Sequence, residues 1–305
     1  MRIRVPILLL TLAVTASGGI IETVRASFAT GSDARAIQEL RAYRTSHGST
    51  PEYLEAFSWL ARAELDSHNY APAETFALEV HALSVEQLKK RTLDREPHLP
   101  IALGAAIEVE GSLLAAQGRR SEAVTYLQEQ AKVFAATSIV ARIRKNLLLL
   151  TLEGKPAPAL ENVVIPKDRP VLLFFWAHWC PDCKAEIPIL MRIRAEFAPK
   201  GLVFLAPTQK YGYVAGGVDA APAIETAYIE QVRRSYYAGL IESPVAISET
   251  NFTRYGASTT PTLVLLDRAG IVRRYHPGAM TYAELREAVE GVIDARGAQK
   301  SAAQK

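Results

Sequence analysis

Residues 171–188 read Val-Leu-Leu-Phe-Phe-Trp-Ala-His-Trp-Cys-Pro-Asp-Cys-Lys-Ala-Glu-Ile-Pro, and this stretch decides the fold. It opens with the continuous apolar run Val171–Trp176, which has the length and composition of a buried strand. After the two cysteines, apolar residues recur close to helical spacing, at Ile187, Leu190, Ile193 and Phe197. The sequence therefore predicts a strand-to-helix turn, with Cys180 at the N-terminus of the helix.

Cys180 and Cys183 are the only two cysteines in the 305-residue chain, which indicates that they act together. The nucleophile in thiol–disulfide exchange is the thiolate, and a helix N-terminus stabilises a nearby anion. We therefore expect Cys180 to be the more acidic and more exposed thiol. Cys183 lies one turn further along, where it can attack a mixed disulfide formed at Cys180. Pro181 suits the first helical turn, and Pro188 is predicted to kink the helix.

Other uses of a cysteine pair fit less well. A disulfide across three residues closes a very small loop and stabilises the fold little. A zinc site needs about four ligands, and two cysteines with His178 fall short. A c-type haem site requires His directly after the second cysteine, where this chain has Lys184. A copper site of Cys180, Cys183 and His178 stays open as an alternative, because soft thiolates suit Cu(I).

The segment 174–188 resembles the active-site segment of thioredoxin-like proteins of the TlpA/ResA type, which are exported bacterial thiol–disulfide oxidoreductases. The resemblance continues through Thr-Thr-Pro-Thr at 259–262, an apolar strand to Asp267, a second strand to Tyr275, and Gly278. It covers roughly residues 152–296. It implies an α/β, thioredoxin-like fold in the C-terminal part of the chain.

The resemblance also implies roles for individual residues. Cys180 matches the attacking cysteine, Cys183 the resolving cysteine, and Glu186 an active-site glutamate. Burial would raise the pKa of Glu186 and let it exchange a proton with Cys183; the alternative is a solvated helix carboxylate. Pro261 matches a cis-proline that faces the cysteines. The expected substrate-binding residues are Trp179, Pro181, Thr260 and Pro261, and the resemblance implies no cofactor and no metal.

The N-terminus has the pattern of an export signal. Met1–Arg4 is positively charged, the apolar run Val5–Ala16 follows, and cleavage is predicted after Ala16 or Ala26. Residues 1–26 are therefore expected to be a signal peptide or an uncleaved membrane anchor. The chain is expected to work outside the cytoplasm, in the periplasm or an equivalent compartment. The net charge of +3 is spread along the chain and gives no case for nucleic-acid binding.

Residues 32–152 are rich in Ala, Leu, Glu and Arg, a composition typical of helices. Segments around Ala73 and Ala123 resemble tetratricopeptide (TPR) helix pairs, although they lie further apart than the usual period of about 34 residues. We predict an all-α, TPR-like domain at 32–152, which serves either as a docking surface or as a spacer. A thioredoxin-like domain at 153–297 and a disordered tail at 298–305 complete the predicted organisation.

An insertion is expected between the strand at 202–206 and Thr260. It consists of a glycine- and tyrosine-rich loop at 211–217, a helix at 222–238, a short strand at 245–247 and a helix at 249–255. The loop is predicted to form a lip over the cysteines. The first strand of the domain is expected to be only 161–165, or missing.

These observations predict an exported protein-disulfide oxidoreductase. The family resemblance favours a reductant of the cytochrome c or copper-site maturation type. Its expected partners are a disulfide-containing substrate protein and a membrane redox partner that supplies electrons. Two alternatives from other classes are a copper-binding chaperone and a helical scaffold whose cysteine pair is redox-inactive.

Overall fold

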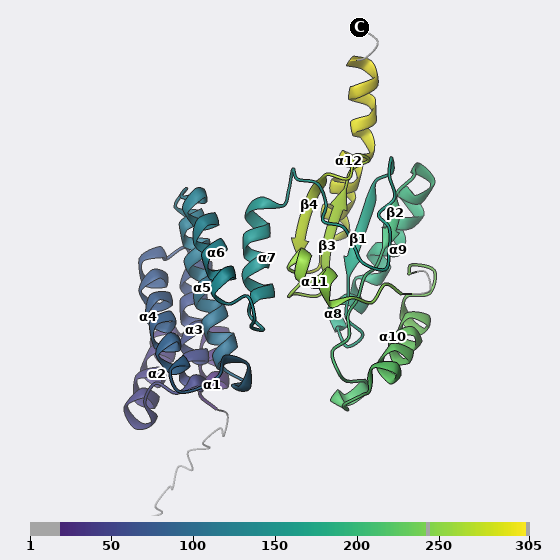
Figure 1. Ribbon diagram of the computed structural model, residues 1–305. Coiled ribbons are helices and arrows are strands. Elements are labelled where there is room, and N and C mark those ends of the chain that lie inside the picture. The colour runs from purple at the N-terminus through teal and green to yellow at the C-terminus, as the bar shows by residue number, and fades with distance from the viewer. Residues whose placement is uncertain (1–18, 242–244, 303–305) are drawn as a thin grey trace, which may run out of the picture. The chain divides into compact units, whose positions relative to one another are not determined.

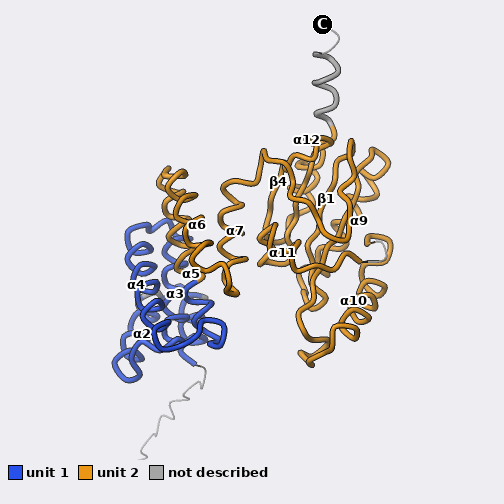
Figure 2. The backbone as a smooth tube through the Cα atoms, in the orientation of Figure 1, with its two compact units in different colours: residues 1–103 blue, residues 104–305 orange. Residues whose placement is uncertain are grey.

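The computed structural model describes the backbone of residues 19–241 and 245–302. The predicted n-region and apolar run of the signal, within residues 1–18, lie outside the described residues. The chain divides into two compact units, one up to residue 103 and one from residue 104 (Figure 2). This division falls inside a helix, whereas the composition placed the domain boundary at 152/153.

The first unit is helical throughout its described length. Its helices are α1 (Ile20–Ala29), α2 (Asp33–His47), α3 (Pro51–Asp66), α4 (Tyr70–Leu88) and the start of α5 (Leu99–Ala116), with a 3₁₀ turn at Leu93–Arg95. The start of α3 is capped: the Thr50 side chain accepts a hydrogen bond from the Tyr53 amide, and Pro51 is the first helical residue.

Helix α1 overlaps the end of the predicted signal segment. Its residues Ile20, Ile21 and Val24 are buried, which makes α1 part of the packed helical unit. Among the described residues, one helix, α5, is long and apolar enough to cross a membrane, and 56% of it is buried.

The second unit begins with the remainder of α5, α6 (Arg120–Val133) and α7 (Val140–Thr151). An ion-pair cluster joins α5 to α7: Glu108 accepts from Arg142 Nε at 2.6 Å and from Lys145 Nζ at 3.0 Å. These helices lead directly into an α/β domain, where Leu152 packs beneath the sheet.

The sheet has four strands in the order β2-β1-β3-β4 (Figure 1). They are β1 (Val171–Phe175), β2 (Val203–Leu205), β3 (Thr262–Leu266) and β4 (Val272–Pro277). β1 and β2 run parallel, with Leu173 opposite Leu205. β3 is antiparallel to both β1 and β4. The connection from β1 to β2 carries the cysteines, so the site lies at the carboxyl end of β1.

Both faces of the sheet are covered, because every β1 side chain is buried. Leu172 and Phe174 face a core shared with α9 (Ile187–Phe197), α10 (Pro222–Tyr236) and α12 (Tyr282–Ala302). Val171, Leu173 and Phe175 face the opposite core, which contains α11 (Glu249–Tyr255) and the end of α7. This alternation of side chains on a fully buried strand produces three layers.

The insertion follows the sequence prediction in part. Helices α10 and α11 form where expected, but residues 245–247 make only an isolated bridge between Thr208 and Ile247. No strand forms at 161–165; an isolated bridge between Pro156 and Ile271 lies nearby in sequence. Helix α12 continues to Ala302 and so runs into the predicted disordered tail, of which residues 303–305 lie outside the description.

Candidate active site

The end of β1 is fixed before the chain turns into the cysteine helix. The buried Trp176 donates its indole N–H to the Ala206 carbonyl at 3.0 Å. Cys180 is the N-cap of helix α8 (Pro181–Ala185), and Pro181 occupies its first turn. The helix is interrupted at Glu186, and α9 begins at Ile187 with Pro188 in its first turn. The predicted turn, cap and kink are therefore confirmed.

Cys180 and Cys183 are joined by a disulfide, with their Cα atoms 5.3 Å apart. The Cys183 backbone N–H donates to Cys180 Sγ at 3.0 Å, and the Thr260 carbonyl oxygen lies 3.3 Å from the same sulfur. The Thr260–Pro261 peptide bond is cis. Cys180 is 1% exposed and Cys183 is 0% exposed, so both are buried in this disulfide form, and the expectation of a more exposed Cys180 thiol stays a prediction.

Glu186 is a buried carboxyl group with an exposed fraction of 2%. One of its oxygens accepts a hydrogen bond from the Met280 amide at 3.1 Å. Burial raises the pKa of Glu186 above its ordinary value, and the Met280 hydrogen bond only partly opposes this. Since Glu186 follows Cys183 by three residues, the two side chains project from the same side of the helix. The alternative of a solvated carboxylate does not fit this burial.

Comparisons with known proteins agree with this geometry. Residues 158–293 match the family model described as a thioredoxin-like domain. The chain contains a thioredoxin-like domain.

Two relatives align over similar lengths. The thioredoxin-like protein YneN of Bacillus subtilis is 29% identical over 143 residues, which cover 47% of this chain and 74% of YneN. The thiol-disulfide oxidoreductase ResA of Bacillus cereus is 25% identical over 144 residues, 47% of this chain and 72% of ResA. A crystal structure of a DsbE-type interchange protein from Chlorobium tepidum shares 24% identity, with a TM-score of 0.35, over 46% of this chain and 97% of that chain.

The thioredoxin-like domain is of the protein-disulfide oxidoreductase type. It combines the fold with a disulfide-linked Cys-x-x-Cys pair, and thiol–disulfide oxidoreductases are among its relatives. The family match does not reach the N-terminal helices, so their TPR-like character stays a prediction.

The four residues expected to contact substrate differ in their exposure to solvent. Trp179 is 45% exposed, Pro181 is exposed, Thr260 is half-buried and Pro261 is buried. A disulfide reaching Cys180 would meet the exposed indole and the Thr260 backbone first. Thr260 contacts Cys180 Sγ through its carbonyl oxygen, Trp179 and Pro181 flank Cys180 in the sequence, and contact of all four residues with substrate stays a prediction.

Sequence reasoning missed one buried acid of the thioredoxin-like domain, Glu225 on α10. It is 1% exposed and lies 3.2 Å from Nε2 of His178, which is equally buried. Burial lowers the pKa of His178, although Glu225 opposes this shift. A glutamate one turn inside an amphipathic helix gives no sign of burial in a single sequence, so no signal pointed to it.

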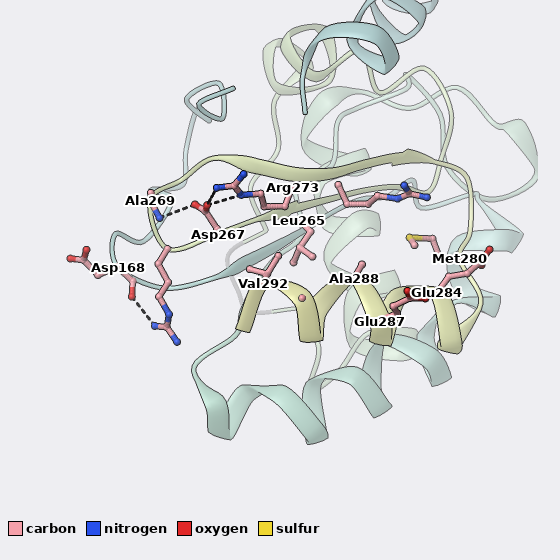
Figure 3. A pocket seen from close by; sticks show the side chains of 13 residues that line it. Asp168, Leu265, Asp267, Ala269, Arg273, Met280, Glu284, Glu287, Ala288 and Val292 are labelled. Atoms are coloured by element: carbon pink, nitrogen blue, oxygen red, sulfur yellow. Dashed lines mark hydrogen bonds and ion pairs between the residues drawn. The ribbon is translucent and has the colours of Figure 1, made fainter. Parts of the chain in front are cut away.

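A groove of about 1000 Å³ lies along β3, β4 and α12, and neither cysteine lines it (Figure 3). Its floor is apolar, and its rim carries both acidic and basic side chains, including Arg273, which pairs with Asp267 at 2.6 Å. Met280 lines this groove, and its amide holds Glu186. The mixed charge of the rim favours no single class of ligand.

The described residues contain no group of three or more metal-ligating side chains. His178, the third ligand of the hypothetical copper site, directs Nε2 to Glu225. This ring nitrogen of His178 therefore already has a carboxylate partner.

Proposed function

We propose that the protein is an exported thiol–disulfide oxidoreductase that reduces disulfides in substrate proteins. The observation that carries the exchange chemistry is the hydrogen bond from the Cys183 amide to Cys180 Sγ at 3.0 Å, and the reducing direction is proposed from the resemblance to ResA-type proteins. This hydrogen bond places a donor on the sulfur that must carry negative charge as the nucleophile. Such a donor at a helix N-terminus lowers the pKa of a thiol.

The reaction proceeds by two exchanges of sulfur partners. The Cys180 thiolate attacks a substrate disulfide, forms a mixed disulfide and releases one substrate cysteine as a thiolate. Cys183 then loses its proton and attacks Cys180 Sγ, which breaks the mixed disulfide and releases the second substrate thiolate. The substrate gains two electrons, and the protein is left with the Cys180–Cys183 disulfide.

Glu186 is proposed to take the proton that Cys183 loses in the second exchange. A buried carboxylate with a raised pKa is a better base near neutral pH than an ordinary glutamate. Its hydrogen bond from Met280 keeps the carboxyl group in place.

Trp179, Pro181, Thr260 and Pro261 are proposed to form the substrate-binding surface. The Thr260 carbonyl oxygen, 3.3 Å from Cys180 Sγ, lies where it can accept a hydrogen bond from the backbone of an extended substrate. Backbone pairing of this kind accepts many sequences.

Regeneration of the dithiol requires a donor, and we propose a membrane redox partner outside the cytoplasm. Support comes from relatives named ResA and DsbE and from the N-terminal pattern of a signal or anchor. The substrate class proposed from the family resemblance is a cysteine pair awaiting cytochrome c or copper-site assembly.

The experiment that tests the proposal traps the substrate. A Cys183→Ser variant, expressed in its native compartment, is expected to accumulate mixed disulfides through Cys180 that dissolve on reduction. The Cys180→Ser variant is the matched control and is expected to trap none. Equal adduct levels in the two variants would contradict the proposed order of attack.

A further inference from the structure

One buried carboxylate gathers three hydrogen-bond donors beside the disulfide. Glu225 accepts from the backbone N–H of Tyr211 at 2.5 Å, from the N–H of Gly212 at 2.9 Å, and from Nε2 of His178 at 3.2 Å. A carboxylate buried to this degree is stable only with such partners. These contacts tie helix α10, the 209–213 loop and the turn before Cys180 to one group.

Three tyrosine rings surround His178 on the side of this loop. Tyr211, Tyr213 and Tyr228 each present an edge-to-face contact, with ring centroids 5.3 to 5.5 Å from the imidazole. Tyr211 also meets Trp179 edge-on at 5.4 Å. The half-exposed Trp179 adjoins Cys180, so the hydrogen bonds of Glu225 fix the aromatic surface next to the reactive sulfur.

The loop has further anchors on both sides of Tyr211, including the backbone hydrogen bond from the Ala220 amide to the Gly212 carbonyl at 2.9 Å. Thr208 donates its hydroxyl to the Trp176 carbonyl at 2.6 Å, and this contact is buried. Beyond Thr208, the backbone amides of Tyr211 and Gly212 are held by Glu225. Loss of the carboxylate would leave Tyr211 without its backbone restraint while the anchor at Thr208 persists.

We propose that Glu225 and His178 are positioning residues that hold Tyr211 and Trp179 as a preformed contact surface for polypeptide disulfides. The inference rests on the proposed function and adds a substrate preference to it. A surface ordered before binding avoids the entropy cost of ordering on contact. Small disulfides should depend less on this surface, because they carry no polypeptide that could contact the loop.

A Glu225→Gln variant tests the inference with little change in volume. The amide keeps one accepting oxygen, but its NH₂ group must face one of the former donors. An unsatisfied buried donor of this kind destabilises the loop geometry. Glu230→Gln is the matched control, because Glu230 lies on the same helix and pairs with Arg233.

The reduced proteins are mixed with two probes, a disulfide-linked peptide and hydroxyethyl disulfide, and second-order rate constants are measured by stopped flow. Glu225→Gln is expected to react about tenfold more slowly with the peptide, a loss of about one hydrogen bond. With hydroxyethyl disulfide, its rate is expected to stay within about twofold of the unsubstituted protein.

Limited trypsin digestion adds a readout of the loop itself. Trypsin cleaves after Lys210, at the bond whose amide belongs to Tyr211. Glu225→Gln is expected to be cut there faster than Glu230→Gln, as followed by mass spectrometry.

The rate constants and the cleavage at Lys210 together separate the inference from the proposed function. Unchanged peptide rates and unchanged cleavage at Lys210 would overturn the inference and leave the proposed function intact. If Glu225→Gln lowered the rate constants with both probes equally, the inference would also be overturned. Glu225 and His178 would then affect the reactivity of the Cys180 thiol and not its contact with substrate. An unsubstituted protein that reacts with neither probe would contradict the proposed function itself.

Discussion

The backbone amide of Cys183 lies 3.0 Å from the sulfur of Cys180, and this relationship makes the two thiols unequal. Both cysteines are buried in the disulfide form, so the expected difference between the thiols comes from this amide, which would stabilise a thiolate at Cys180 in the dithiol form. We expect the pKa of Cys180 to fall below the ordinary value of about 8.5. Iodoacetamide should therefore alkylate Cys180 well before Cys183 at pH 7, as read by mass spectrometry of the peptides. Equal alkylation rates would contradict the assigned order.

Glu186 should make stability depend on pH. Its pKa is raised by burial, so the native state holds the proton to higher pH than the unfolded state. The free energy of unfolding should then fall as pH rises from about 4.5 through the native pKa. Glu186→Gln should flatten this decline in urea unfolding of the oxidised protein. The exposed Glu287→Gln is the control, and a slope unchanged in Glu186→Gln would contradict the raised pKa.

The carboxyl group of Glu186 should also control the rate at which Cys183 resolves the mixed disulfide. With Glu186 as the base for Cys183, the second exchange should speed up as Glu186 loses its proton. Glu186→Gln should slow the release of a mixed disulfide from Cys180 and remove that rise with pH. Stopped-flow measurement of release across pH 5 to 9 checks this; an unaltered profile would assign Glu186 a structural role alone.

Glu108 is expected to stabilise the junction between α5 and α7. Burial alone would raise its pKa, but Arg142 and Lys145 outweigh burial and lower it to about 2. The pKa is depressed, so the stabilisation is present above about 4.5 and is lost as pH falls toward about 2. Glu108→Gln should reduce the free energy of unfolding at pH 7 by about 2 kcal/mol, since it removes the negative charge that Arg142 and Lys145 both contact.

The exposed pair of Glu122 with Arg119 provides the control for Glu108. Glu122→Gln should change stability little, because exposed pairs contribute little. The two variants should also differ in pH dependence, with the loss from Glu108→Gln shrinking toward pH 2. A loss that is constant with pH would mean that packing, and not charge, accounts for it.

Gly256 should not tolerate a side chain. It ends α11 with a φ of +55°, and an added Cβ would lie 2.5 Å from the Lys145 backbone nitrogen. Gly256→Ala should therefore cost about 3 kcal/mol, from the left-handed backbone and from overpacking against α7. Gly270→Ala, with a φ of +75° and nothing near the added Cβ, should cost only about 1 kcal/mol. Thermal unfolding of both variants checks the difference.

Local chemistry made the core of the site predictable. The apolar run to Trp176, the N-cap position of Cys180 and the break before Pro188 each follow from short-range rules of helix and strand formation. The cis bond at Pro261 and the burial of Glu186 entered through family resemblance, because neither follows from spacing in one sequence.

The rest depends on contacts between segments far apart in the chain. In the sequence, Glu225 looks like an ordinary helix residue. Only the folded structure shows its contacts with His178 and with the amides of the 209–213 loop. The lowered pKa of Glu108 likewise depends on Arg142 and Lys145, which lie on another helix. Residues 161–165 were expected to form a strand or none, and no strand forms there; local propensity does not reveal whether a segment finds a partner strand.

The central claim is that Cys180–Cys183 reduces protein disulfides, and the equilibrium reduction potential of this pair tests it most directly. The oxidised protein would be equilibrated with dithiothreitol buffers of graded ratio and the dithiol fraction read by thiol alkylation. The account predicts a low potential, near the value of roughly −270 mV known for thioredoxin. A potential near roughly −120 mV, as in DsbA, would make the protein an oxidant and contradict the claim.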